Sequence, residues 1–230
     1  MEKYDIDVVV FDCGWGGEII GDFIAEEIPF RVEKVIDYKN AQYGEKDFEE
    51  LRDLVERALL KYIGKVRVIV LADAVMALEL MDYLQRKYPR QKFVGYGRGL
   101  VKMIRMMGMK KVMVLTTNGV KKQGMFKMME KMAEARIVEP ECRGWGKKID
   151  DGEMMDGEVR RTVEKFRGDA VVIYATGFLD VEENIKKYVK KRTKVVDMKG
   201  VLLKDVCEAL GLVGKDGRTT RERLKEAMGE

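Results

Sequence analysis

Short runs of β-branched and other apolar residues alternate along the chain with stretches in which apolar residues recur every three or four positions. Eight of the short runs are predicted strands, over residues 7–12, 31–37, 66–72, 92–95, 111–116, 135–139, 169–175 and 194–197. The first, third, fifth and seventh are almost continuously apolar, as expected of strands buried on both faces. Strands that alternate with helical patterns predict βαβ units, and therefore an α/β protein with mainly parallel sheets flanked by helices.

The helical spacing is clearest in three stretches between the strands. Their apolar positions are Phe48, Leu51, Leu54, Val55 and Ala58; Val75, Leu78, Met81, Tyr83 and Leu84; and the methionines Met125, Met128, Met129 and Met132. A methionine stripe is typical of a core or a dimer interface rather than a cofactor site, so we expect a homodimer. Residues 214–230 are polar and charged, and are expected to form either a frayed tail or a final surface helix.

The two halves of the chain resemble each other. Residues 66–74 (VRVIVLADA) and 168–177 (GDAVVIYATG) both end a buried strand in a small residue followed by a polar one. Residues 7–17 (DVVVFDCGWGG) and 111–120 (KVMVLTTNGV) both run from a strand into a polar turn with glycine. This repetition predicts two pseudo-symmetric lobes.

We expect the N-terminal lobe to comprise residues 1–95 plus 208–230, and the C-terminal lobe residues 96–207. Four similar strand ends would then face one crevice between the lobes. Because ligands of open α/β sheets bind outside the carboxyl ends of the strands, this crevice is the expected ligand cleft.

Composition favours a soluble protein of the cytoplasm. No apolar run approaches the roughly 20 residues that a membrane-spanning helix requires. The segment MEKYDID at residues 1–7 is acidic and polar, whereas a signal peptide begins with basic residues and an apolar stretch. Few prolines and many lysines and glutamates are typical of a thermophile.

The cysteine and histidine counts exclude several kinds of chemistry. The three cysteines, Cys13, Cys142 and Cys207, are far apart and form no CxxC pair, which argues against a disulfide framework or a structural zinc site. The chain has no histidine, which excludes Ser-His-Asp and Cys-His nucleophiles, histidine-ligated metals and imidazole proton transfer. We therefore predict no metal, and expect any acid–base chemistry to use carboxylates, thiols, lysines or tyrosines.

Charge is nearly balanced overall but not locally. The net charge is +4, from 44 basic and 40 acidic residues. Residues 90–129 contain no aspartate or glutamate, although they contain many lysines and arginines. The favoured interpretation is a solvated basic surface. The alternatives are a surface for nucleic acid or an acidic partner, and a positive field that draws a small anionic molecule into the cleft.

The segment VVVFDCGWGG at residues 8–17 carries the most chemical information. Its strand delivers Asp12 and Cys13 to the edge of a sheet. The glycines that follow are expected to let backbone N–H groups approach a ligand, before a helix that starts near Glu18. Helix N-termini attract anions through their unpaired N–H groups and the helix dipole. A structural tight turn is the alternative interpretation.

This segment resembles the FDSGxGG opening of the glutamate racemases, which belong to the aspartate/glutamate racemase superfamily. Further similar segments follow in the family's order over roughly residues 5–210. They are QYGEK at 42–46, like the family's PYGxK loop; VIVLADAVMALE at 68–79, in the place of its ACNTA strand; TNG at 117–119 with KQGMF at 122–126, like its Txx(T)xxxGxY stretch; and VVIYATGFL at 171–179, in the place of GCTHxP.

The resemblance implies an amino-acid racemase that needs no cofactor, in which two cysteines exchange the Cα proton from opposite faces of the substrate. In this chain the first cysteine position matches Asp73, and the next family residues, Asn and Thr, match Ala74 and Val75. The second cysteine position matches Thr176, and the following Thr-His matches Gly177 and Phe178. The loss of both thiols argues against racemisation by the two-cysteine route.

Other residues keep part of the family's site. Asp12 matches the family's N-terminal acid, and Cys13 stands where the family has serine. Cys13 is interpreted either as a base or nucleophile with a lowered pKa, or as a small buried thiol; Cys142 and Cys207 are expected to be structural. The candidate catalytic residues are Asp12, Cys13, Asp73 and Thr176. The candidate ligand-binding residues are Gly14, Trp15, Gly16, Gly17, Tyr43, Gly44, Ala74, Thr117, Asn118, Gly119 and Gly177.

Two functions are compatible with these residues. The first is a racemase-like protein that binds a small, carboxylate-containing ligand in the cleft without racemising it. The second is an active relative, an isomerase or a lyase such as a decarboxylase, that acts on a small carboxylic acid with Asp12, Cys13 and Asp73. An ionised Asp73 would repel a carboxylate, so an amine or hydroxyl of the ligand is the expected neighbour there. Binding of nucleic acid or an acidic partner by the basic surface is the third interpretation.

Overall fold

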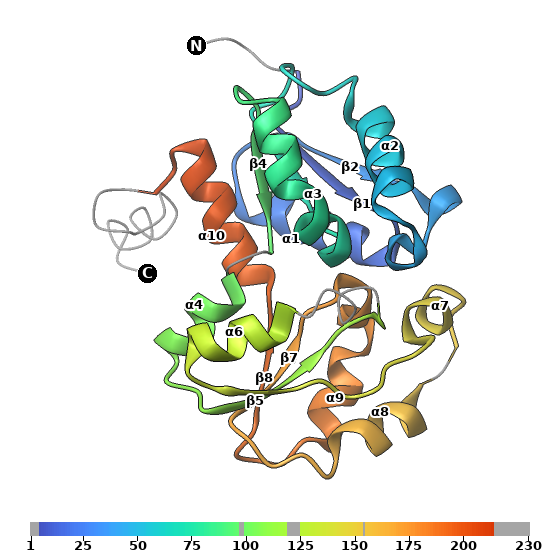
Figure 1. Cartoon of the computed structure of the whole chain (residues 1–230), viewed down its shortest axis with the longest axis vertical. Helices are drawn as coiled ribbons and strands as arrows, with labels where there is room; N and C mark the ends of the chain where they lie inside the picture. The colour runs from blue at the N-terminus through green and yellow to red at the C-terminus, as the bar shows by residue number, and fades with distance from the viewer. Residues whose placement is uncertain (1–4, 97–98, 119–124, 154, 214–230) are drawn as a thin grey trace.

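The computed structural model describes residues 5–96, 99–118, 125–153 and 155–213 of the 230-residue chain. Two four-stranded sheets, all of whose strand pairs are parallel, form its framework (Figure 1). This architecture confirms the predicted fold class. Predictions for Gly119, for residues 122–124 and for the tail at 214–230 lie outside the described residues.

The N-terminal lobe contains the sheet β2-β1-β3-β4. Its strands are β1 (Val8–Asp12), β2 (Val32–Ile36), β3 (Val68–Leu71) and β4 (Lys92–Gly95). β1 and β3 lie in the middle of the sheet, and every one of their residues is buried. Burial on both faces explains why these two segments are continuously apolar in the sequence.

The C-terminal lobe contains the sheet β6-β5-β7-β8. Its strands are β5 (Lys111–Leu115), β6 (Arg136–Val138), β7 (Ala170–Ile173) and β8 (Lys194–Asp197). In each sheet the first strand in sequence pairs with both the second and the third, and the fourth pairs with the third. The shared strand order confirms the pseudo-symmetry that the internal repetition predicted.

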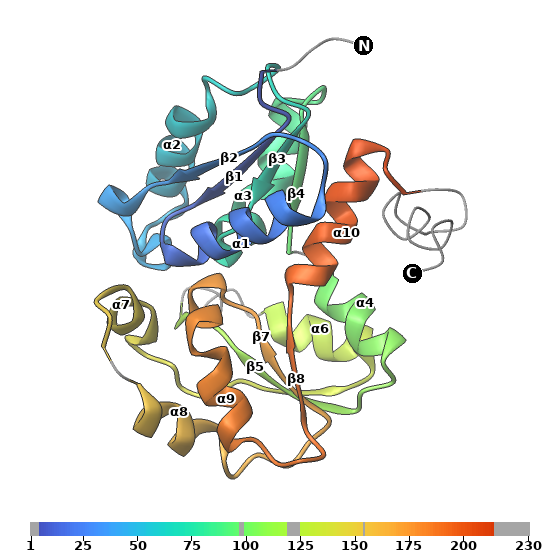
Figure 2. The ribbon, with the colours of Figure 1, turned by 180° about the vertical axis from the view of Figure 1, so that it is seen from behind.

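Helices cover the faces of both sheets (Figures 1 and 2). Those of the N-terminal lobe are α1 (Trp15–Glu27), α2 (Phe48–Leu59) and α3 (Ala74–Lys87), with short 3₁₀ turns at Tyr38–Asn40 and Tyr43–Glu45. Those of the C-terminal lobe are α4 (Gly99–Met106), α6 (Met125–Ala133), α7 (Trp145–Asp150), α8 (Asp156–Val163) and α9 (Glu182–Tyr188), with a 3₁₀ helix, η3, at Thr176–Val181. In the part of the chain that the structure describes, no helix is long and apolar enough to cross a bilayer.

The helix α10 (Lys199–Leu210) returns from the C-terminal lobe to the N-terminal one (Figure 2). It contacts β3, β4 and α1 of the N-terminal lobe, and also α4. The Lys92 ammonium donates to the carbonyl of Ala209 at 2.6 Å, which ties the end of α10 to β4. The expected lobe boundary between residues 207 and 208 falls inside this helix.

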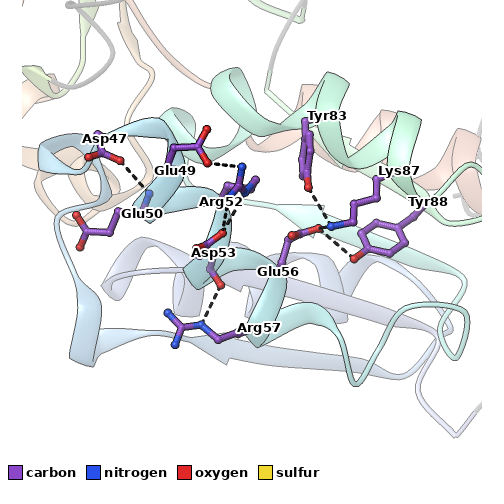
Figure 3. Close-up of polar contacts among 10 residues, drawn as sticks. All are labelled: Asp47, Glu49, Glu50, Arg52, Asp53, Glu56, Arg57, Tyr83, Lys87 and Tyr88. Atoms are coloured by element: carbon purple, nitrogen blue, oxygen red, sulfur yellow. Dashed lines mark hydrogen bonds and ion pairs between the residues drawn. The ribbon is translucent and has the colours of Figure 1, made fainter.

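A polar network joins α2 to α3 (Figure 3). Glu56 pairs with the Lys87 ammonium at 2.6 Å and accepts from the Tyr88 hydroxyl at 3.1 Å. The Lys87 ammonium also donates to the Tyr83 hydroxyl at 3.0 Å. At the start of α2, the Asp47 carboxylate accepts from the Glu50 N–H at 2.9 Å and caps the helix. These contacts hold α2 and α3 against each other. The loops after β1 and β3 meet at one edge because the two strands are adjacent and parallel.

The predicted methionine stripe is only partly core. Met129 on α6 is buried, whereas Met128 and Met132 on the same helix are exposed. Two further methionines, Met106 and Met107, are exposed at the end of α4, which contacts α6.

Candidate functional site

A cavity of about 520 Å³ lies between the two lobes, at the carboxyl ends of the central strands. Every predicted site residue lines it except Gly17, which packs beneath it, and Gly119, which is not described. The residues on its wall are Asp12, Cys13, Gly14, Trp15, Gly16, Tyr43, Gly44, Asp73, Ala74, Thr117, Asn118, Thr176 and Gly177. The structure therefore brings together segments that are more than 160 positions apart in the sequence.

Asp12 is the buried centre of this site. It ends β1 and is only 3% exposed. One carboxylate oxygen accepts from the N–H groups of Cys13 at 2.6 Å and Gly14 at 3.1 Å, and the other accepts from the Thr176 hydroxyl at 3.1 Å. Burial, and then the nearby Asp73 carboxylate, raise the pKa of Asp12 well above its usual value in spite of these hydrogen bonds.

Asp73 faces the same space from the end of β3. Its carboxylate caps α3, because it accepts from the Met76 N–H at 2.7 Å and also from the Val75 N–H. Burial raises the pKa of Asp73 to about 6, although the two backbone hydrogen bonds oppose the shift. The midpoint of the titration of this carboxyl group therefore lies about one pH unit below neutrality, and the ionised form predominates at pH 7.

Cys13 does not have the lowered pKa that its place before a helix suggested. It is 9% exposed, and burial together with the carboxylates of Asp73 and Asp12 raises the pKa of its thiol well above the usual value. The N–H groups of Gln42 and Tyr43 bond to the sulfur but do not offset this effect. Of the two interpretations of Cys13, its burial and then the two neighbouring acids favour the small buried thiol over the activated one.

Three side chains at the cleft offer ligand atoms at short range. A carboxylate oxygen of Asp12, the sulfur of Cys13 and a carboxylate oxygen of Asp73 lie within 4.8 Å of one another. The Asp12 oxygens and the Cys13 sulfur already accept hydrogen bonds from backbone or hydroxyl groups. The expected absence of a metal stays a prediction.

The helix α1 begins at Trp15, and not near Glu18 as predicted. Gly16 and Gly17 therefore lie in its first turn, where they are needed for close packing rather than for a flexible loop. A Cβ on Gly16 would lie 2.4 Å from the Cβ of Thr176 and 2.5 Å from the Gly177 nitrogen, and a Cβ on Gly17 would lie 2.3 Å from the Cβ of Asp12. Gly16 thus lets the two lobes touch beside the cavity.

The start of α1 is occupied by the protein's own acid. The Asp150 carboxylate of α7 accepts from the Trp15 N–H, so a side chain of the C-terminal lobe sits at the N-terminus of a helix of the other lobe. Partial burial raises the pKa of Asp150. The Trp15 ring is 47% exposed and lines the mouth of the cavity. The N–H groups that were expected to receive an anionic ligand are thus partly taken.

Several residues of the wall were not predicted. Arg143, Lys147 and Asp150 come from the loop after β6 and from α7, and Glu45 follows the Tyr43–Gly44 pair. Cys142, expected to be structural, is buried but also lies on the cavity wall. The basic residues could have been suspected from the sequence RGWGKK at 143–148, in which two cations flank a glycine-rich turn.

The strand order and the cleft define a two-lobed α/β protein, and comparison with known proteins finds the same fold. No family model matches the chain. A solved structure of glutamate racemase from Bacillus anthracis superposes with a TM-score of 0.78 at 16% identity, covering 91% of this chain and 83% of that one. Glutamate racemase from Francisella tularensis, solved with D-glutamate, gives 0.77 at 16% identity over 90% and 81%. The chain has the fold of the aspartate/glutamate racemase superfamily.

In sequence the chain is similar to several glutamate racemases. It is 26% identical over 178 residues to the glutamate racemase of Clostridium acetobutylicum, which covers 73% of this chain and 69% of the relative. It is 27% identical over 210 residues to that of Clostridium botulinum, covering 86% and 81%. These findings confirm the resemblance that the sequence motifs indicated.

Proposed function

We propose that this racemase-like protein binds a small ligand in the cleft between its lobes and does not racemise it by a two-thiol route. One observation carries the proposal. The two cavity residues that match the family's cysteine positions are a carboxyl group, Asp73, on the N-terminal lobe and a hydroxyl group, Thr176, on the C-terminal lobe.

Inversion at a carbon requires one group that removes a proton on one face and a second that supplies a proton on the other. Asp73, with its pKa of about 6, is able to exchange protons near neutral pH. Thr176 is not, because an alcohol does not titrate in this range, and its hydroxyl donates to the buried Asp12. The Cys13 thiol has a raised pKa and therefore forms little thiolate at neutral pH, so it is a poor base.

The cleft supports a binding function independently of catalysis. Its volume of about 520 Å³ is in the range of pockets for small molecules. Its wall combines an apolar part with a few polar groups that converge from both lobes, among them Asp73 from one and Asn118 and Arg143 from the other. The structures of two similar proteins contain D-glutamate and L-glutamate respectively. We infer a ligand of similar size that carries a carboxylate.

The test combines binding with proton exchange. Isothermal titration calorimetry of the purified protein against a panel of L- and D-amino acids and dicarboxylic acids is expected to identify at least one ligand. The same ligands, incubated with protein in D₂O, are expected to keep their Cα hydrogen, as read by NMR. Conversion of L-glutamate or L-aspartate to the D form at an enzyme-like rate would overturn the proposal.

A second function is favoured by the position of Asp73. A single carboxyl group that titrates near pH 6 and faces a cavity is suited to one-base proton transfer, as in an isomerase or a lyase. In that case deuterium would enter a small carboxylic acid without racemising it. The exchange rate would fall at least about 100-fold in Asp73→Asn, in line with the loss of a general base, and would also change in Cys13→Ser.

Three other expectations stay predictions. A homodimer is tested by light scattering of the purified protein. Binding of nucleic acid or an acidic partner to the basic surface is tested by its fall with salt. Localisation in the cytoplasm is tested by cell fractionation.

A further inference from the structure

The charges on the cavity wall are unevenly distributed. Asp12, Asp73 and Glu45 line it from the N-terminal lobe, and no lysine or arginine of that lobe does so among the described residues. The positive charges, Arg143 and Lys147, come from the C-terminal lobe, which also contributes one acid, Asp150. Both are exposed at the rim, and neither forms an ion pair with a described residue. The wall of the cleft on the N-terminal lobe is therefore acidic, and both positive charges lie at the edge on the C-terminal lobe.

The N-terminal-lobe wall also lacks the usual means of holding an anion. Helices that begin at a ligand site bind anions through their first N–H groups. Here α1 and α3 both begin at the cavity, but N–H groups at the start of each helix already donate to the protein's own carboxylates. Asp12 takes the N–H groups of Cys13 and Gly14, Asp150 takes that of Trp15, and Asp73 takes that of Met76.

On this wall a second carboxylate of the ligand would consequently meet acidic side chains, and the N–H groups of Trp15, Val75 and Met76 already donate to the protein's own carboxylates. A ligand ammonium group, in contrast, would find carboxylate oxygens of Asp12 and Asp73 within 4.8 Å of one another. Opposite charges attract and like charges repel most strongly where water is excluded. The ligand's single carboxylate would then lie toward Arg143 and Lys147.

We propose that the cleft selects amino acids with a basic side chain, holding an ammonium group between Asp12 and Asp73, and excludes the acidic amino acids. This inference rests on the proposed binding function and goes beyond it, because it assigns the charge of the ligand. It also distinguishes this chain from the two similar proteins that were solved with glutamate.

Ornithine and glutamate are matched probes, since they share the α-amino-acid end and are close in length but carry opposite charges at the far end. Calorimetric titration of both enantiomers at pH 7.5 is expected to give a dissociation constant at least about ten-fold lower for ornithine than for glutamate, because of the two acids. Equal affinity, or tighter binding of glutamate, overturns the inference while leaving the proposed function intact. If neither ornithine, glutamate nor any other member of the panel binds, both fail.

Variants locate the ammonium group and the carboxylate. Asp73→Asn is expected to weaken ornithine binding at least about ten-fold and to narrow its advantage over glutamate. Arg143→Ala combined with Lys147→Ala is expected to weaken the binding of ornithine but not of putrescine, which has no carboxylate. Lys148→Ala is the control, because Lys148 lies on the same helix but pairs with Glu158 and does not line the cavity. Unchanged ornithine binding in Asp73→Asn overturns the inference.

Discussion

Asp73 provides a test of the electrostatics that is independent of any ligand. Its pKa is about 6 in the folded protein, against an ordinary value of 3.8. The folded state therefore binds more protons than the unfolded state between about pH 4 and pH 6. The contribution of Asp73 to stability is fully present below pH 3.8, and is lost as the pH rises through about 6.

The variant Asp73→Asn has no titrating group at this position, so it does not lose stability as the pH rises through about 6. Asparagine is close in shape and is as good a helix cap as aspartate, so the contact with the Met76 N–H can be kept. A shift from 3.8 to about 6 corresponds to about 3 kcal/mol at 1.36 kcal/mol per pKa unit. The variant is thus expected to be more stable than the parent by about 3 kcal/mol at pH 7.5 and by almost nothing at pH 4. For a chain of this length the gain corresponds to roughly 6–12 °C in Tm.

The assay is urea unfolding of both proteins at pH 4 and pH 7.5, with the difference between them taken at each pH so that other titrating groups cancel. Asp47→Asn is the matched control, because Asp47 caps α2 in the same way but is exposed. The free energy of unfolding of the Asp47→Asn protein is expected to differ from that of the parent by less than about 1 kcal/mol at either pH. A destabilised Asp73→Asn protein at pH 7.5, or a gain of equal size at both pH values, would refute the reasoning.

Three further predictions concern the contacts around the cavity. Gly16→Ala is expected to lower the free energy of unfolding by about 1–3 kcal/mol, because the new Cβ would clash with Thr176. Gly146→Ala is the control and is not expected to lower it, since nothing lies within 4 Å of its Cβ. Thermal denaturation compares the two variants. Cys13 is expected to react with iodoacetamide at pH 8 at less than about one-tenth of the rate of free cysteine, because its raised pKa disfavours the thiolate. Mass spectrometry measures the extent of labelling, and rapid labelling would contradict the burial of the thiol. Thr176→Val is expected to cost about 1–3 kcal/mol in chemical denaturation through the lost bond to Asp12, and a neutral result would show that the bond does not tie the lobes.

The fold was predictable because burial leaves a direct trace in the sequence. Strands β1 and β3 are buried on both faces, so their apolar runs marked them with ends correct to within two residues. The cleft was predictable because residues after parallel strands meet at one edge, and the resemblance to glutamate racemases named the positions of Asp12, Asp73 and Thr176. This part of the site depends on local sequence and on topology alone.

The rest of the site depends on contacts between the lobes, which local patterns do not encode. Gly16 and Gly17 have low helix propensity and predicted a turn, but the packing of Thr176 against Gly16 requires glycine inside a helix. Arg143 and Asp150 reach the cavity because α7 packs against η3 and the start of α1, and no periodicity in residues 140–150 predicted that helix. The pKa of Cys13 likewise depends on Asp73, which is 60 positions away.

The contacts across the cleft link the stability of the protein to its affinity for the ligand. The Thr176 hydroxyl donates to Asp12, and the Trp15 N–H donates to Asp150. Each lobe therefore contributes a carboxylate that accepts a hydrogen bond from the other lobe. Asp73 is the member of this set that contacts no residue of the C-terminal lobe through a hydrogen bond in the described structure. Its burial lowers stability at neutral pH, and a cation bound beside it in the cleft would offset that cost. The same substitution, Asp73→Asn, should therefore stabilise the protein and weaken its affinity for an amine. A variant that gained stability and retained affinity would separate the two effects, and would show that the carboxyl pair is not where the ligand's positive charge lies.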